Sequence, residues 1–98
     1  DLIVVSDEVY EHLTYDGIKH VSIASLPGMK DRTLVISSGG KTFNTTGWKV
    51  GWVCGPAAMV AAARAAKQFL TYVSSGPFQP AMLPGDFTNA ARPSVELG

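Results

Sequence analysis

The stretch TLVISSGGK, residues 33–41, begins as an apolar run and ends in small polar residues, two glycines and a lysine. A short run of β-branched and aliphatic residues is typical of a strand that is buried on both faces, as in a parallel sheet. The run at residues 2–5 has the same character and is followed by Ser6 and Asp7. Two such strands, each ending in polar residues, indicate an α/β sheet with functional side chains at one edge.

The segment between the two runs, residues 8–32, is longer than the dozen or so residues that a connection between parallel strands requires. Both carboxyl ends can therefore lie at the same edge of one sheet, which is where ligands bind in open α/β folds. Within this segment, residues 22–26 predict a short helix that ends before Pro27.

The sequence after Lys41 predicts one more strand and one longer helix. Residues 48–54 are rich in Val and Trp, which favours a strand. Pro56 suits the first position of the helix that follows. Apolar residues recur there at three- and four-residue spacing, namely Met59, Ala63, Ala66, Leu70 and Val73. Arg64, Lys67 and Gln68 are expected elsewhere on the helix surface.

Composition limits the chain to one globular domain. It has 98 residues, of which 46% are hydrophobic and 16% charged, with a formal net charge of zero. The eight basic and eight acidic residues are spread along the chain, which disfavours nucleic acid and anionic membranes as partners. No apolar run is long enough to span a bilayer. The single cysteine, Cys54, excludes an internal disulfide and fits a reducing, cytoplasmic compartment.

Three motifs, in a fixed order, carry the chemistry of the sequence. They are DEVY at residues 7–10, SSGGKTF at residues 37–43 and TGWKVGW at residues 46–52. Together they resemble the cofactor-binding core of the class I/II aminotransferases, which are fold type I enzymes that depend on pyridoxal 5'-phosphate (PLP). The resemblance is closest to the group of kynurenine aminotransferase, glutamine transaminase K and N-succinyldiaminopimelate aminotransferase.

The resemblance covers residues 1–82 and implies a fold as well as an activity. It implies an α/β fragment of the three-layer PLP-binding large domain, with a mostly parallel sheet in which the strand at residues 48–54 is antiparallel. Residues 83–98 depart from the family pattern and contain neither helical periodicity nor a β-rich run. We expect them to form an irregular tail.

The resemblance also assigns a role to each of five residues. Lys41 matches the lysine that holds PLP as a Schiff base and, once released, carries the α-proton of the substrate. Asp7 matches the carboxylate that keeps the pyridine nitrogen protonated, and Tyr10 matches the hydroxyl that donates to the phenolic oxygen. Ser38 and Lys49 match the hydroxyl and the cation that bind the phosphate, although many relatives have Arg in place of Lys49.

The implied reaction is the transfer of an amino group from an amino acid to a 2-oxo acid, in a full-length protein that is several times longer and forms a homodimer. Because much of such a protein is missing here, a second hypothesis is that the chain is a non-catalytic, truncated remnant. A third is a PLP-dependent lyase or synthase on the same fold, since the core motif is shared.

Other kinds of site are disfavoured by spacing. A phosphate-binding loop of the Walker A type needs Gly where Val35 stands, and no glycine fingerprint of a dinucleotide site follows either strand. His12, His20 and Cys54 lack the spacing of metal ligands, so no metal is expected. Trp48 and Trp52 are expected to be packing residues.

Overall fold

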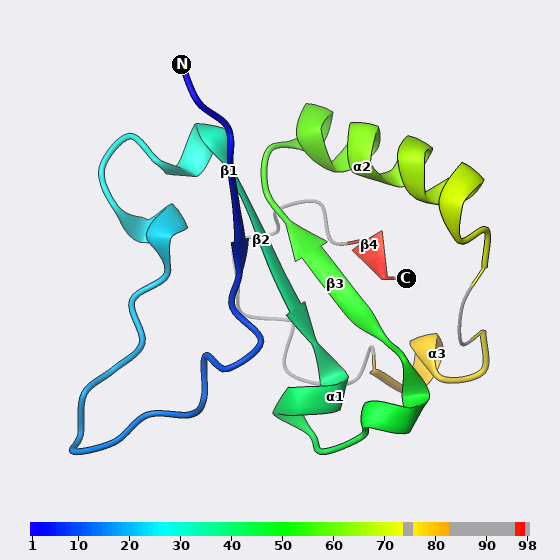
Figure 1. Ribbon diagram of the computed structural model, residues 1–98, viewed down its shortest axis with the longest axis horizontal. Coiled ribbons are helices and arrows are strands. Elements are labelled where there is room, and N and C mark those ends of the chain that lie inside the picture. Colours follow the sequence, from blue (N-terminus) through cyan, green and yellow to red (C-terminus); the bar gives the residue numbers. More distant parts are fainter. Residues whose placement is uncertain (74–75, 83–95, 98) are drawn as a thin grey trace.

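The computed structural model describes residues 1–73, 76–82 and 96–97, and its centre is a sheet with the strand order β1-β2-β3-β4 (Figure 1). The strands are β1 (Val4–Asp7), β2 (Thr33–Ser38), β3 (Gly51–Cys54) and β4 (Glu96–Leu97). Figure 1 shows α2 (Ala57–Leu70) running alongside the sheet on the β3 side, with the long connection from β1 to β2 on the other side.

The sheet is mixed. β1 pairs with β2 in parallel, as predicted, and β3 pairs with β2 in the antiparallel direction that the family resemblance implies. β4 is antiparallel to β3, so three strands run in one direction and β3 runs against them. Only one of the three pairings is parallel, so the expected mostly parallel sheet is a mixed sheet in the described part of the chain.

The strand boundaries differ from the predicted ones for local reasons. β1 begins at Val4 rather than Leu2, and it includes Asp7 because the Glu8 N–H continues the ladder to the Ile36 carbonyl at 2.8 Å. β3 begins only at Gly51, because the preceding residues form a 3-10 helix, η3 (Thr46–Trp48), and Lys49 is left-handed with φ 54°.

Helix α2 confirms the helix predicted after Pro56, but its burial differs from the prediction. Pro56 is extended and occupies the N-cap position, one residue before the helix. Val60 is the buried side chain of α2, whereas Leu70 at its end and Val73 beyond it are exposed. The second half of the predicted apolar stripe is therefore uncovered, and Lys67 is more buried there than Leu70.

Short helices shape the connections. They are η1 (Ile23–Ser25), η2 (Lys30–Arg32), α1 (Gly39–Thr42) and α3 (Gln79–Met82). Ser22 caps η1, as its hydroxyl accepts from the Ala24 N–H at 3.3 Å. The short helix predicted around residue 24 is thus present as a 3-10 turn.

The hydrophobic core is small. Among the described residues, the buried hydrophobic side chains are Val50, Val60 and Met82. Residues 83–95 and 98 of the predicted irregular tail lie outside the described residues, while Glu96 and Leu97 of that tail form β4. No helix among the described residues is long and apolar enough to cross a bilayer.

Candidate functional site

The five residues predicted to bind a cofactor come from the same edge of the sheet. Asp7 ends β1 and lies opposite Ile36 of the parallel strand β2, which ends two residues later at Ser38. Because side chains alternate between faces, Asp7, Ile36 and Ser38 project from one face of the sheet. β3 starts at this edge, since Ser38 pairs with Gly51, which places Lys49 here as well.

Lys41 lies in α1, directly after β2, and hydrogen bonds hold this turn in place. The Gly39 N–H donates to the Val50 carbonyl at 3.0 Å. The Thr45 hydroxyl donates to the Gly39 carbonyl at 3.0 Å, and the Thr46 hydroxyl donates to the Gly40 carbonyl at 3.2 Å. Lys41 is itself exposed, so a fixed backbone presents a solvent-accessible amine.

The two glycines before Lys41 have a packing role within the chain. A Cβ at Gly40 would lie 3.0 Å from Cα of Thr46, and a Cβ at Gly39 would overlap the end of the Met82 side chain. In the structure, these glycines allow the chain to fold back on itself around Lys41.

Asp7 is the last residue of β1, and Tyr10 lies on the turn that follows. The Asp7 carboxylate accepts from the Val9 N–H at 3.2 Å, and the Glu11 N–H donates to the Glu8 carbonyl at 3.0 Å. Asp7 and Tyr10 are both exposed, with Tyr10 at 59%. The Lys41 Nζ lies 5.5 Å from the centroid of the Tyr10 ring, which is a cation–π contact. Residues 31 positions apart in the sequence therefore meet.

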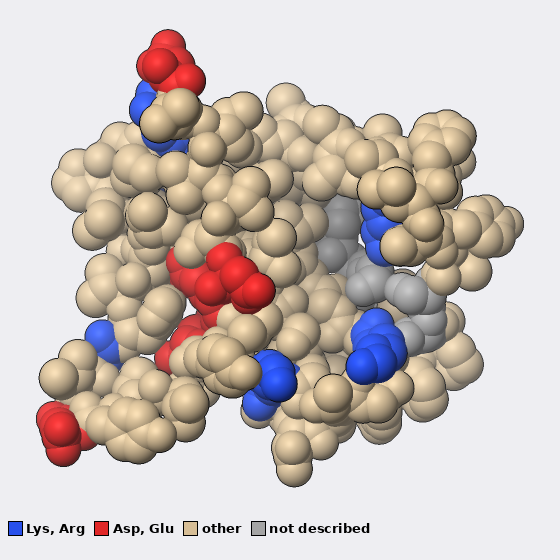
Figure 2. All heavy atoms as spheres, in the orientation of Figure 1, with Lys and Arg blue, Asp and Glu red and all other residues tan. Residues whose placement is uncertain are grey.

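Figure 2 shows that charged side chains of both signs lie in this region. Acidic side chains gather beside the end of β1, and basic side chains lie over α1 and near it. Ser38 is half-buried and stands at the N-cap of α1, yet its hydroxyl makes no capping hydrogen bond. A hydroxyl, two amines, a phenol and a carboxylate thus share one edge of the sheet.

Sequence reasoning missed Glu8, the most buried acidic residue of this region at 7% exposure. Its carboxylate accepts from the hydroxyls of Ser6 and Ser22 at 3.0 and 2.9 Å and lies 2.9 Å from His20 Nε2. The backbone N–H of Ile23 donates to it at 3.3 Å. The alternation of side chains along a strand could have indicated this, because it directs Glu8 to the same face as Ser6 and away from Asp7.

The pKa of Glu8 results from opposing effects. Burial raises it, but the hydrogen bonds from His20, Ser22, Ser6 and the Ile23 N–H outweigh burial, so the pKa is lowered from its ordinary value of 4.5. Glu8 is therefore a charged structural anchor for the segment at residues 20–23.

A second carboxylate, Glu11, was also missed. The Ser37 hydroxyl donates to Glu11 Oε1 at 2.9 Å, and Ser37 is 1% exposed.

Burial, together with the negative charge of Glu11, raises the pKa of the Cys54 thiol, which disfavours a thiolate. Cys54 is therefore suited to packing rather than to nucleophilic attack.

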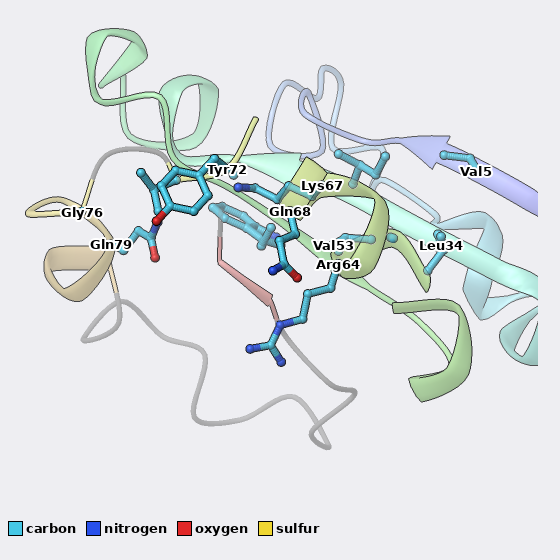
Figure 3. Close-up of a pocket in the computed structure, with 14 residues that line it drawn as sticks. Val5, Leu34, Val53, Arg64, Lys67, Gln68, Tyr72, Gly76 and Gln79 are labelled. Atoms are coloured by element: carbon cyan, nitrogen blue, oxygen red, sulfur yellow. The ribbon is translucent and has the colours of Figure 1, made fainter. Parts of the chain in front are cut away.

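A groove of about 940 Å³ lies between α2 and the sheet, and none of the five predicted residues lines it. Its lining includes Val5, Leu34 and Val53, together with Arg64 and Lys67 of α2 (Figure 3). The groove adjoins the candidate site, because its lining also includes Ile36, which pairs with Asp7, and Gly51, which pairs with Ser38.

The tryptophan and the two histidines considered in the sequence make contacts with neighbouring side chains. Trp48 stacks on Phe78 with ring centroids 4.8 Å apart, as expected for a packing residue. His20 contacts Glu8, and His12 lies 3.8 Å from Glu11. In the described part of the chain, no group of three or more His, Cys, Asp or Glu residues is arranged to hold a metal ion.

With this geometry established, comparison with known proteins gives the class of the chain. The family Aminotransferase class I and II matches residues 1–84. The chain therefore belongs to the class I and II aminotransferase family.

Two relatives show which aminotransferases the chain resembles. The chain is 56% identical over 82 residues to a probable N-succinyldiaminopimelate aminotransferase of Mycobacterium tuberculosis, covering 84% of this chain and 21% of that protein. It is 51% identical over 82 residues to kynurenine–oxoglutarate transaminase 3 of Rattus norvegicus, covering 84% of this chain and 18% of the relative. The chain thus spans about a fifth of the length of these relatives.

Solved structures of aminotransferases agree with this family assignment. The N-succinyldiaminopimelate aminotransferase of Mycobacterium tuberculosis superposes with a TM-score of 0.79 at 57% identity, covering 83% of this chain and 21% of that one. YbdL of Escherichia coli, which has a methionine aminotransferase function, superposes with a TM-score of 0.75 at 39% identity over 86% of this chain and 23% of its own. The α/β fold with its mixed sheet is that of known aminotransferases.

Proposed function

We propose that the protein to which this chain belongs is a PLP-dependent aminotransferase that moves an amino group from an amino acid to a 2-oxo acid, and that Lys41 is its cofactor-binding lysine. The observation that carries the proposal is the contact between Lys41 and Tyr10, at 5.5 Å, beside Asp7 in a chain of this family.

The residues present fit PLP by their chemistry. The amine of Lys41 can bond covalently to an aldehyde, and the exposed carboxylate of Asp7 can hold a proton on a pyridine nitrogen. Tyr10 can donate its hydroxyl proton to a phenolic oxygen. Ser38, whose hydroxyl does not cap α1, and the cation of Lys49 can bind a phosphate. When bound, PLP supplies an electron sink that makes the α-proton of an amino acid acidic.

Each residue then has a defined task. Lys41 holds the cofactor and, once its amine is released, accepts and returns the α-proton. Asp7 would hold the proton on the ring nitrogen, and its carboxylate is oriented by the Val9 N–H at 3.2 Å. Tyr10 stands next to the Lys41 amine, where its hydroxyl could donate to the phenolic oxygen of the cofactor.

We further propose that the sheet belongs to a three-layer large domain formed largely by residues 1–82, to which Glu96 and Leu97 of the tail add the short strand β4. Apolar side chains point to both faces of β1 and β2, since Val4 and Val35 lie on one face and Val5 and Ile36 on the other. A sheet with two apolar faces requires cover on both sides. By the same resemblance we propose a cytoplasmic homodimer whose substrates are small molecules.

The test is PLP binding by the chain and by the variant Lys41→Ala, with Lys30→Ala as the matched control in η2. Wild type and Lys30→Ala are both expected to show a visible absorbance band on adding PLP and a pyridoxyl group on Lys41 after borohydride reduction. Lys41→Ala is expected to show neither. A pyridoxyl group spread evenly over all lysines would overturn the assignment of Lys41.

Asp7→Asn tests the charge without losing the turn, since an amide oxygen also accepts from the Val9 N–H. In the full-length protein, half-transamination is expected to slow by at least about 100-fold, as for other preorganised charges. Asp31→Asn in η2 is the matched control. The same assay separates the aminotransferase from a PLP-dependent lyase or synthase, which would not convert an amino acid to its 2-oxo acid.

A second candidate function, a non-catalytic remnant, is favoured by one observation. Large hydrophobic side chains such as Leu2, Ile3 and Phe69 are exposed in the 98-residue chain. If the chain acts alone, it is expected to bind PLP weakly and to show no turnover.

A further inference from the structure

The two halves of the candidate site come from different strands, and a partly buried side-chain contact joins them. Tyr10 belongs to the turn after β1, whereas Lys41 belongs to α1 after β2. Between the two, the Ser37 hydroxyl donates to Glu11 Oε1 at 2.9 Å. Glu11 is the neighbour of Tyr10 in the sequence, and Ser37 is the neighbour of Ser38.

This contact lies beneath the site, not in it. Ser37 is 1% exposed, and the side chain of Glu11 is 26% exposed. Because side chains alternate along β2, Ser37 projects from the face opposite to Ser38. Neither residue was assigned a role in binding, and any effect on the site must act through their neighbours.

The turn that carries Tyr10 is anchored at both ends. At one end Glu8 is held by Ser22 at 2.9 Å and by the Ile23 N–H at 3.3 Å. At the other end, Glu11 provides the side-chain link to β2, and the Glu11 N–H closes the turn on the Glu8 carbonyl at 3.0 Å. Loss of the second anchor leaves the Tyr10 end of the turn without a side-chain tie to the strand that leads to Lys41.

We propose that Glu11 and Ser37 are positioning residues that hold the Tyr10 ring next to the Lys41 amine. This proposal rests on the proposed function, because it assumes that Lys41 is the cofactor-binding lysine and that Tyr10 acts beside it. It is tested first by a measurement that needs no cofactor.

The first measurement is NMR on the full chain with its lysine amines labelled by reductive ¹³C-methylation. The ring current of Tyr10 shifts the methyl signal of Lys41 upfield, and this signal is identified by its absence in Lys41→Arg. In Ser37→Ala and Glu11→Ala the upfield shift is expected to fall by at least half. Glu11→Gln is expected to keep most of it, because the amide oxygen accepts the same hydrogen bond.

Ser25→Ala is the matched control, since it also removes one serine hydrogen bond, to the Ser22 carbonyl at 2.7 Å, away from the site. It is expected to leave the Lys41 signal unchanged. Circular dichroism confirms that each variant folds. An unchanged Lys41 signal in folded Ser37→Ala and Glu11→Ala would overturn the proposal.

The second measurement is the affinity for PLP, which Ser37→Ala and Glu11→Ala are expected to weaken about 3- to 10-fold, the value of one hydrogen bond. Glu11→Gln should restore most of the affinity. The two measurements separate the two claims. Failure of the full-length protein to bind PLP overturns the proposed function, whereas the Lys41 signal alone decides whether Glu11 and Ser37 hold Tyr10 in place.

Discussion

Glu8 shows how a buried charge can serve structure next to a site without belonging to it. Its carboxylate receives hydrogen bonds from Ser6, Ser22 and the Ile23 N–H and contacts His20. Asp7, its neighbour, is exposed and bonds only locally, to the Val9 N–H, among the contacts described above. Two adjacent acidic residues therefore have separate roles because they point to opposite faces of one strand.

Removing the Glu8 carboxylate is expected to destabilise the chain. Glu8→Ala leaves several donors without an acceptor in a buried place, which we expect to lower the free energy of unfolding by about 2–4 kcal/mol. Urea denaturation measures this change. Asp31→Ala, at an exposed position in η2, is the control and should change the free energy by less than about 0.5 kcal/mol. Equal effects of the two substitutions would contradict the anchoring role of Glu8.

The same residue predicts a pH dependence. The pKa of Glu8 is lowered in the folded chain from its ordinary value of 4.5. A lowered pKa means that the ionised form stabilises the fold, so its contribution is complete above the unfolded pKa and is lost as the pH falls through the folded pKa. Urea midpoints measured from about pH 6 down to about pH 3 should fall, and fall less steeply in Glu8→Gln. Identical slopes in the two proteins would rule out Glu8 as the cause.

At the scale of elements, β2 and β3 approach each other closely where Gly55 follows β3. A Cβ at Gly55 would lie 2.7 Å from the Thr33 carbonyl oxygen and 2.8 Å from Leu34 Cδ2. The backbone of β2 cannot move aside without disturbing the ladder from Val35 to Ser38.

Gly55→Ala is therefore expected to lower the free energy of unfolding by about 1–3 kcal/mol, the usual cost of overpacking. Gly47→Ala is the matched control, because a Cβ there meets nothing within 4 Å. Thermal melting compares the two variants. A melting temperature of Gly55→Ala that equals that of Gly47→Ala would show that the strands adjust freely.

Much of this arrangement could be predicted from the sequence because it depends on local patterns. The apolar runs identified β1 and β2, and the length of their connection allowed a parallel pair with Asp7 and Lys41 at one edge. The antiparallel β3 was predicted from family resemblance, and the helix after Pro56 from periodicity.

Other features could not be predicted, because they depend on contacts between distant residues. The hydrogen bonds of Glu8 depend on the path of the chain 12 to 15 residues later, where His20, Ser22 and Ile23 approach it. The role of Gly40 depends on Thr46 folding back over it. The exposed end of α2 could not be predicted either, since periodicity indicates which residues share a face but not whether anything covers that face.

At the scale of the whole molecule, many large hydrophobic side chains of the described residues are exposed. Its core contains few buried hydrophobic side chains among the described residues, while large ones such as Leu2, Val5, Tyr15 and Phe69 are exposed. Contiguous exposed apolar surface favours association.

The isolated 98-residue chain is accordingly expected to self-associate and to bind the dye ANS. Light scattering after size-exclusion chromatography should show a mass that rises with concentration, and ANS fluorescence should exceed that of a full-length relative per unit mass. Leu2→Glu and Phe69→Glu, which place charges on exposed positions, should reduce both signals. A concentration-independent monomer with no ANS signal would contradict this expectation.

The parallel register of β1 and β2 also determines where the chain tolerates a change of length. The turn at Asp16 and Gly17 is exposed and has no part in the ladder, so an inserted peptide tag there should leave the candidate site intact. Deletion of one residue inside β1 would instead exchange Asp7 and Glu8 between the two faces of the sheet. A single missing codon would then bury the carboxylate that is now exposed and expose the one that anchors the fold.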